Sequence, residues 1–201
     1  MIITIGRQFG SGGLLIAKAL SKKLGIPYYN RELLALAAKE SGLSEDLFKS
    51  ADEKPTSSLL YSIACGSYYL GNTNNLTYKE LPLNDQLFLI QVQTIKDLAA
   101  KGSCIIVGRC ADYILADYAN VLKVFVHAPI EERLKRAIEV YDVPEEKALD
   151  TVKRNDKSRA AYYNYHSDNK WGLSTTYDIC LNSYTLGIDK CVEMLAKMVQ
   201  E

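Results

Sequence analysis

Four glycines fall within the segment from Gly6 to Gly13, which reads Gly-Arg-Gln-Phe-Gly-Ser-Gly-Gly. The segment follows the apolar, β-branched run 2–5 and precedes a stretch whose apolar residues have helical spacing. Glycine lets several backbone N–H groups of a turn converge on one point, and a helix start adds further N–H groups and the positive end of its dipole. We therefore predict that the backbone around Gly6, Gly10, Gly12 and Gly13 binds phosphate groups. A plain strand-to-helix turn is the alternative.

The usual phosphate-binding loop ends in Gly-Lys-Ser/Thr, in which the lysine reaches the outer phosphates and the hydroxyl binds Mg²⁺. Here Gly13 stands at the lysine position and Leu14 at the hydroxyl position. Another cation must then meet the phosphates, and Arg7 inside the loop is a candidate. Ser11 is a candidate for a Mg²⁺ contact through its hydroxyl, although a role as N-terminal cap of the next helix fits its position equally well.

The elements that would position this loop alternate between strand and helix. Short apolar or β-branched runs predict strands at 2–5, 26–29, 104–107, 121–127 and 177–181. Helical spacing and capping residues predict helices at 14–24, 31–40, 44–51, 84–101, from 129 onward, 144–165 and 187–199. The pattern predicts an α/β fold in which a parallel sheet of about five strands has helices on both faces.

Ligands of such sheets bind beyond the carboxyl ends of the strands, so Gly6 and Gly108 are expected to face one crevice. Arg109 follows Gly108 directly, and we expect it in that crevice rather than in a surface ion pair. For Arg154 and Arg159, a place at a site and a place on a solvated helix face are both open.

Aromatic residues gather at Tyr162, Tyr163, Tyr165 and Trp171. They could stack on a base, but such residues more often cover the edge of a core, and we favour the core. Structural roles are expected for both histidines, His127 and His166.

The composition bounds the function. The 201 residues, 48% of them hydrophobic, suit one globular domain. The 24 basic and 24 acidic residues cancel, which argues against a nucleic-acid polymer or an anionic membrane as the main partner. No apolar run reaches the ~20 residues that a bilayer requires, and no signal peptide is expected. The five cysteines form no CxxC pair, so zinc is not expected and a reducing, cytoplasmic setting fits best.

The stretch 55–82 carries a weak signal. A helical piece near 59–65 and a loop around 71–75 are the interpretations offered. We expect an acceptor-side or lid insertion at approximately 53–85, or a contact within a homodimer.

The chain resembles the cytidylate-kinase-like family of P-loop proteins, relatives of nucleoside monophosphate kinases. Five segments in family order carry the resemblance, at 3–13, 24–33, 105–115, 156–163 and, split in two, 171–172 with 177–183. The resemblance implies one P-loop kinase-like domain over 1–201, with a lid-like helical segment at approximately 144–172.

The resemblance also implies roles for individual residues. Gly10, Ser11, Gly12 and Gly13 would hold the phosphates of ATP, with Mg²⁺ as the second cofactor. Arg109 would clamp the phosphate of a small-molecule acceptor, whose other contacts would include Asn30, Arg31 and Asp112. A catalytic set at the lid would comprise Arg154, Asp156 and Arg159, because guanidinium groups match phosphate oxygens. Asp156 and Arg159 stand three apart on a helix and can pair in the absence of ligand.

Two positions depart from the family pattern. Leu14 stands where arginine commonly follows the double glycine, and Asn30 stands where aspartate commonly follows the two tyrosines. The expected activity is transfer of the γ-phosphoryl group of ATP to a nucleoside monophosphate such as CMP or dCMP. Two alternatives stay open: a nucleotide-binding module of weak or absent activity, and a kinase with a non-nucleotide acceptor.

Overall fold

The computed structural model describes residues 1–51 and 82–200. Within them, five parallel strands form one sheet in the order β2-β3-β1-β4-β5, which confirms the predicted α/β class. The strands are β1 (Ile2–Arg7), β2 (Tyr28–Tyr29), β3 (Cys104–Val107), β4 (Val121–His127) and β5 (Ile179–Asn182). The chain therefore enters the sheet at its middle strand, and the glycine-rich loop leaves the centre of the sheet.

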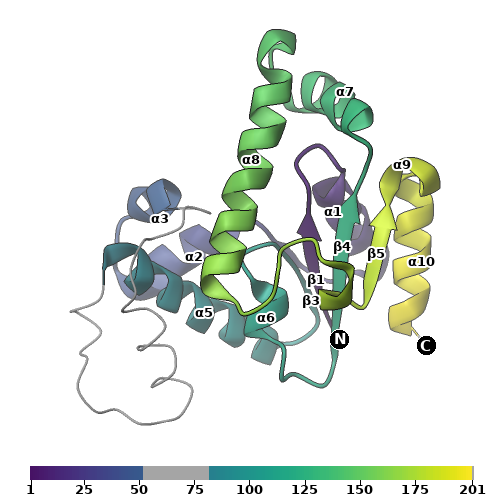
Figure 1. The fold of residues 1–201 in the computed structure, drawn as a ribbon. Helices are drawn as coiled ribbons and strands as arrows, with labels where there is room; N and C mark the ends of the chain where they lie inside the picture. Colours follow the sequence, from purple (N-terminus) through teal and green to yellow (C-terminus); the bar gives the residue numbers. More distant parts are fainter. Residues whose placement is uncertain (52–81, 201) are drawn as a thin grey trace.

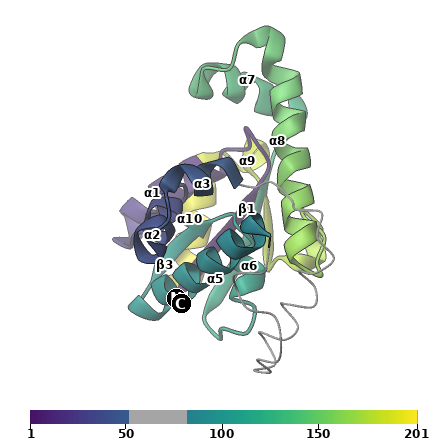
Figure 2. The ribbon, with the colours of Figure 1, turned by 90° about the vertical axis from the view of Figure 1, so that its left-hand side faces the viewer.

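Helices lie on both faces of the sheet, as the alternating pattern predicts (Figure 1). One face is covered by α1 (Gly13–Leu24), α10 (Ile188–Gln200) and the short α9 (Ser183–Leu186). The other face is covered by α2 (Glu32–Ser41), α5 (Leu83–Lys101), α6 (Ala111–Ile114) and α8 (Glu145–His166), and α3 (Glu45–Ala51) packs against α2 and α5. Seen from the side, α7 (Ile130–Tyr141) and the adjoining end of α8 project beyond the sheet (Figure 2).

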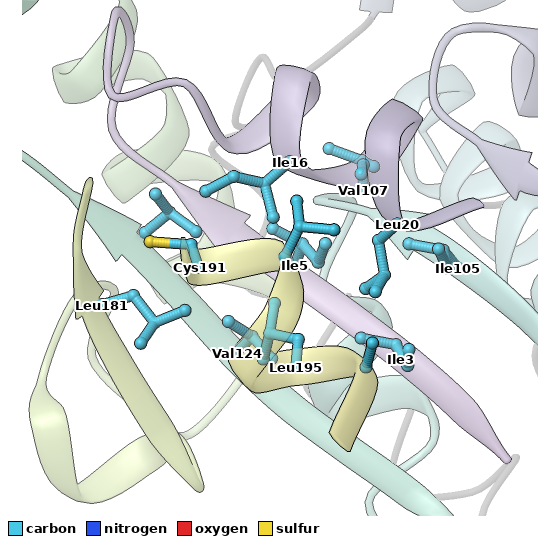
Figure 3. Packing of buried hydrophobic residues seen from close by; sticks show 14 residues of the cluster. Ile3, Ile5, Ile16, Leu20, Ile105, Val107, Val124, Leu181, Cys191 and Leu195 are labelled. Atoms are coloured by element: carbon cyan, nitrogen blue, oxygen red, sulfur yellow. The ribbon is translucent and has the colours of Figure 1, made fainter. Parts of the chain in front are cut away.

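The core follows the period of two that a doubly covered sheet requires. Ile3, Ile5, Ile105 and Val107 point toward α1 and α10, where Ile16, Leu20 and Leu195 close the cluster (Figure 3). The alternate residues of the same strands, among them Ile2, Cys104 and Ile106, pack under α5 and α6. This burial on both faces fixes the register that brings the ends of β1 and β3 together.

Local details differ from the sequence-based expectations at a few places. The predicted strand at 177–181 begins two residues later, because Tyr177 turns into the core beside Phe125. The short helices α6, α9 and Ser174–Thr176 (η2) were not predicted, since each is about one turn long and carries no periodic signal. Ser44 accepts a hydrogen bond from the N–H of Asp46 at 3.2 Å, so its side chain caps the start of α3.

The aromatic cluster of the C-terminal half lies in the core. Tyr162, Tyr163, Tyr165 and Trp171 all belong to the hydrophobic cluster under α5, α6 and α8, in line with the core interpretation. The predicted helix at 59–65 and loop at 71–75 lie outside the described residues, as does most of the predicted insertion 53–85. Among the helices that the structure describes, none is long and apolar enough to cross a membrane.

Candidate functional site

A cavity of about 610 Å³ opens above the carboxyl ends of β1 and β3, between the glycine-rich loop, the start of α2 and the helices α7 and α8. We name it the arginine cavity, because four arginines line it. Its described lining comprises Arg7, Gln8, Phe9, Gly10, Gly12, Gly13, Leu14, Asn30, Arg31, Arg109, Tyr141, Val143, Asn155, Ser158 and Arg159.

The backbone N–H groups of the loop divide into used and unused donors. Gln8 donates to the carbonyl of Val126, Phe9 to the carboxylate of Asp156, and Ser11 to the carbonyl of Gln8. In the described part of the chain, the N–H groups of Gly10, Gly12, Gly13 and Leu14 have no hydrogen-bond partner, and all four residues line the arginine cavity. Buried donors are nearly always paired, so this group of amides is suited to an anion.

The start of α1 contributes to the same nest of amides. Gly12 precedes the helix with a φ of 84°, and the first intrahelical bond runs from Ile16 to the carbonyl of Gly12. The amides before that bond cannot be satisfied inside the helix. The helix dipole adds positive potential at this point.

The charge of the lining is one-sided. Arg7, Arg31, Arg109 and Arg159 contribute guanidinium groups, whereas none of the described lining residues is acidic. One of these arginines is held in a defined position by its surroundings. Arg109 is 4% exposed, adopts a φ of 57° and donates from Nε to the carbonyl of Asn30 at 3.3 Å.

The side chain of Arg7 lies between the loop and the end of β3. A Cβ atom on Gly13 would stand 2.7 Å from Cβ of Arg7, and one on Gly108 would stand 1.8 Å from its Nη1. These two glycines therefore make room for Arg7, whose guanidinium lies where the loop, β3 and the cavity meet. The role of Arg7 as the loop's own cation stays a prediction.

Asp112 lies in a recess of about 20 Å³ beside the arginine cavity, with Arg7, Arg109 and Arg159 lining both spaces. The Tyr163 hydroxyl donates to Oδ2 of Asp112 at 2.6 Å. Burial raises the pKa of the Asp112 carboxyl, and this effect outweighs the hydrogen bond from Tyr163, which lowers it. Burial and the neighbouring carboxyl raise the pKa of Tyr163, so the phenol keeps its proton and remains a donor.

Asp156 is not among the residues that line the described cavity. Its carboxylate forms an ion pair with Arg133 of α7 and accepts the N–H of Phe9 at 2.7 Å. Arg133, which was not predicted, is therefore a cation partner of Asp156. The pairing of Asp156 with Arg159 stays a prediction. The packing of α7 against α8 brings Arg133 next to Asp156.

The other predicted site residues separate into two groups. Gly10, Gly12, Gly13, Asn30, Arg31, Arg109 and Arg159 come together around the arginine cavity, while Gly6 lines the neighbouring recess. Arg154 is exposed on α8 and is not among the cavity's lining residues. Ser11 is fully buried, its hydroxyl donates to the carbonyl of Gln8 at 2.8 Å, and the cap of α1 is Gly12 rather than Ser11.

The sequence-based expectations missed the contribution of α7. Arg136 donates to the carbonyl of Gly10 at 2.6 Å, and Arg133 donates to the carbonyl of Phe9 at 3.4 Å. The two arginines stand three residues apart and so share one helix face, which is a detectable signal. Nothing in the sequence pattern, however, indicates that this face meets the loop.

The described residues fit a polyphosphate but do not build a site for Mg²⁺. Four unpaired amides and four guanidinium groups match phosphate oxygens. Proteins usually bind Mg²⁺ through one or two carboxylates together with substrate phosphates. No carboxylate lines the described cavity, and the hydroxyl of Ser11, the predicted contact, is turned away from it.

The comparisons with known proteins agree with this architecture. The model of the cytidylate kinase-like family matches residues 2–185. The structure of an uncharacterized protein from Eubacterium ventriosum has 31% sequence identity and a TM-score of 0.73, and the match covers 100% of this chain and 99% of that one. No curated protein matches the chain.

Two more distant structures show the shared fold. Shikimate kinase from Bacteroides thetaiotaomicron has 13% identity and a TM-score of 0.55, with 100% of this chain and 99% of that chain covered. The protein TT1252 from Thermus thermophilus has 17% identity and a TM-score of 0.54, with 100% and 96% covered. The match along nearly the whole chain, together with the likeness to the Eubacterium protein, shows that this protein belongs to the cytidylate kinase-like family and has a P-loop kinase fold.

Proposed function

We propose that this protein is a kinase that transfers the γ-phosphoryl group of ATP to a small acceptor which itself carries a phosphate, with a nucleoside monophosphate such as CMP or dCMP as the first candidate. The observation that carries the proposal is the lining of the arginine cavity: unpaired amides and four arginines, with no carboxylate among the described residues. Such a lining favours two phosphate-bearing ligands over a neutral one.

The distribution of the cations supports a donor end and an acceptor end. Arg7 and Arg159 lie with the loop amides, where the triphosphate of ATP would bind. Arg31 and Arg109 lie with Asn30 beside the ends of β2 and β3, where the acceptor phosphate would bind. The γ-phosphoryl group would then pass from the donor end, at Arg7 and Arg159, to the acceptor end, at Arg31 and Arg109.

The absence of a free carboxylate from the described lining bears on the type of acceptor. An alcohol acceptor has to lose a proton during transfer, and kinases commonly provide an aspartate for this step. Both aspartates of the predicted site are engaged in the described structure, Asp112 by Tyr163 and Asp156 by Arg133 and Phe9. A phosphate acceptor attacks through an oxygen that is already ionised, so it needs no such base.

The transfer itself would be in line. An oxygen of the acceptor phosphate forms the new bond to the γ-phosphorus as the bond to the β–γ bridging oxygen breaks, and ADP leaves. The guanidinium groups and loop amides neutralise charge on the transferred group, which is the main catalytic work in this chemistry. Tyr141, Val143 and Ser158 from the α7–α8 region wall the cavity and would limit access of water.

The predicted cytoplasmic setting is part of the proposal. Cys104, Cys110, Cys180 and Cys191 are all free thiols in the described structure, which supports a reducing compartment.

The test is a transfer assay followed by ³¹P NMR. ATP is offered with CMP, dCMP, UMP or AMP, and in parallel with the matching nucleosides, which present only hydroxyl groups. The proposal expects ADP and a nucleoside diphosphate from at least one monophosphate, and no product from the nucleosides. Transfer to a nucleoside alone would contradict the phosphate acceptor. Tight ATP binding without any transfer would instead support the nucleotide-binding module.

A further inference from the structure

The direction of the Gly12 N–H is fixed by the carbonyl of Ser11, which belongs to the same peptide plane. In a trans peptide the N–H of one residue points opposite to the C=O of the residue before it. The N–H of Gly12 therefore points away from the carbonyl of Ser11. That carbonyl accepts a hydrogen bond from the hydroxyl of Ser183 at 2.5 Å.

We propose that Ser183 is a positioning residue for the phosphate nest, acting on bound phosphate through the Ser11–Gly12 peptide. This inference rests on the proposed function, because it assigns a role at the same donor site. Ser183 is 2% exposed and does not line the arginine cavity, so its hydroxyl acts on the loop and not on the ligand.

The surroundings of Ser183 hold its side chain in place. It is the first residue of α9, directly after β5, and the Asn182 side chain before it accepts the N–H groups of Tyr184 and Thr185. The carbonyl of His127, at the end of β4, is the second acceptor near the hydroxyl, at 3.4 Å. With one proton to donate, the hydroxyl serves the nearer carbonyl of Ser11.

The loop's hydrogen-bond pattern explains why this contact matters here. The carbonyl of Gly12 accepts the N–H of Ile16 inside α1, and this bond fixes the peptide plane that carries the Gly13 amide. In the same way, Arg133 donates to the carbonyl of Phe9 and fixes the peptide plane of the Gly10 amide. Gly12 has a φ of 84° and is therefore free of the constraints that a side chain would impose. Without a lysine at Gly13, phosphate affinity depends on these amides, and Ser183 is the group that orients the middle one.

The test compares two serines that make the same kind of hydrogen bond. Ser183→Ala removes the bond to the Ser11 carbonyl. Ser21→Ala is the matched control, since the Ser21 hydroxyl donates to the carbonyl of Ile26 at 2.6 Å, away from the cavity. Binding of inorganic tripolyphosphate is measured by titration calorimetry, and thermal unfolding is recorded for each variant.

We expect Ser183→Ala to weaken tripolyphosphate binding by about threefold to tenfold, the effect of one misdirected hydrogen bond. Ser21→Ala should bind as the wild type does. In the transfer assay, KM for ATP should rise in Ser183→Ala while KM for the acceptor stays unchanged. Ser183→Thr, which keeps the hydroxyl, should restore the affinity.

Other outcomes overturn the inference. Wild-type affinity in Ser183→Ala, or equal losses in both alanine variants, would show that Ser183 has no specific role in the nest. If Ser183→Ala fails to fold, the tripolyphosphate affinities of Ser183→Thr and Ser183→Cys are compared instead. Equal affinities of these two variants would overturn the inference, because only threonine keeps the hydroxyl. A wild-type protein that binds no tripolyphosphate would refute the donor site itself, whereas binding without any transfer would leave Ser183 in its role and remove only the kinase activity.

Discussion

At the scale of single residues, position along a helix separates side chains of the same type. Arg154 and Arg159 both belong to α8, but Arg154 is exposed to solvent while Arg159 lines the arginine cavity. Nη1 of Arg159 donates to the carbonyl of Arg7 at 3.2 Å, and its guanidinium lies 5.7 Å from the centre of the Phe9 ring. Arg159 is therefore held next to the loop and can reach a phosphate there.

Arg159→Ala is expected to lower kcat/KM for transfer by roughly tenfold to a hundredfold, because a charged hydrogen-bond donor to phosphate is lost. Arg154→Ala should stay within about twofold of the wild type, as exposed substitutions usually do. Steady-state kinetics with ATP and the best acceptor measure both. Equal losses in the two variants would show that α8 places its arginines differently during transfer.

His166 gives a second prediction at this scale. Its ring stacks on Phe88 with 3.8 Å between centroids, and burial lowers its pKa from 6.5 to about 3. The folded protein then binds fewer protons than the unfolded chain between these pH values, so the free energy of unfolding decreases as the pH falls below about 6.5.

His166→Gln should remove this contribution. Between pH 7 and pH 5, the free energy of unfolding of the wild type is expected to fall by about 2 kcal/mol more than that of the variant. Urea unfolding at both pH values provides the measurement. Parallel pH profiles of the two proteins would mean that His166 titrates normally in the folded state.

At the scale of elements, α7 is docked on the glycine-rich loop. Arg133 and Arg136 donate to the carbonyls of Phe9 and Gly10, and Asp156 of α8 joins Arg133 to the N–H of Phe9. The backbone approaches equally closely, because a Cβ atom on Gly10 would stand 2.4 Å from the carbonyl oxygen of Arg133. Gly10 is thus needed for the packing of α7 as well as for its own φ of 76°.

Two glycines with similar backbone angles separate these effects. Gly25 has a φ of 67° and open space around its Cα, so Gly25→Ala should cost only the left-handed strain, about 1 kcal/mol. Gly10→Ala should cost about 1–3 kcal/mol more, because the methyl group meets the backbone of α7. Urea unfolding of the two variants measures the difference. Equal losses would mean that α7 yields readily and is not packed on the loop.

This docking also shows where sequence-based prediction stops. The strand-to-helix transition at 2–24 was predictable from β-branched residues, glycines and helical spacing, all of which are local. The contact of Arg133 with Phe9 joins residues far apart in the chain, and a helix face of alternating charges carries no sign of its partner. The same holds for Asp156. Its place on a helix could be predicted from the sequence, but its ion pair with Arg133 of α7 could not.

At the scale of the whole molecule, a balanced net charge coexists with a local concentration of positive charge. The sequence has no net charge, yet four arginines meet at the arginine cavity, drawn from β1, the turn before α2, the end of β3 and α8. Parallel strands bring these ends to one edge of the sheet, so the crevice could be predicted from the fold class alone. The order β2-β3-β1-β4-β5 could not, because five similar apolar runs do not specify which pairs become neighbours.

The central claim is that the amides of Gly10, Gly12, Gly13 and Leu14 bind phosphate without a lysine. Amide resonances in ¹H–¹⁵N spectra, followed during titration with ATP, test it most directly. We predict downfield shifts of the four amide protons, with the Ser11 amide, already bonded to Gln8, moving much less. ATP binding that leaves these four resonances in place would contradict the claim and locate the nucleotide elsewhere.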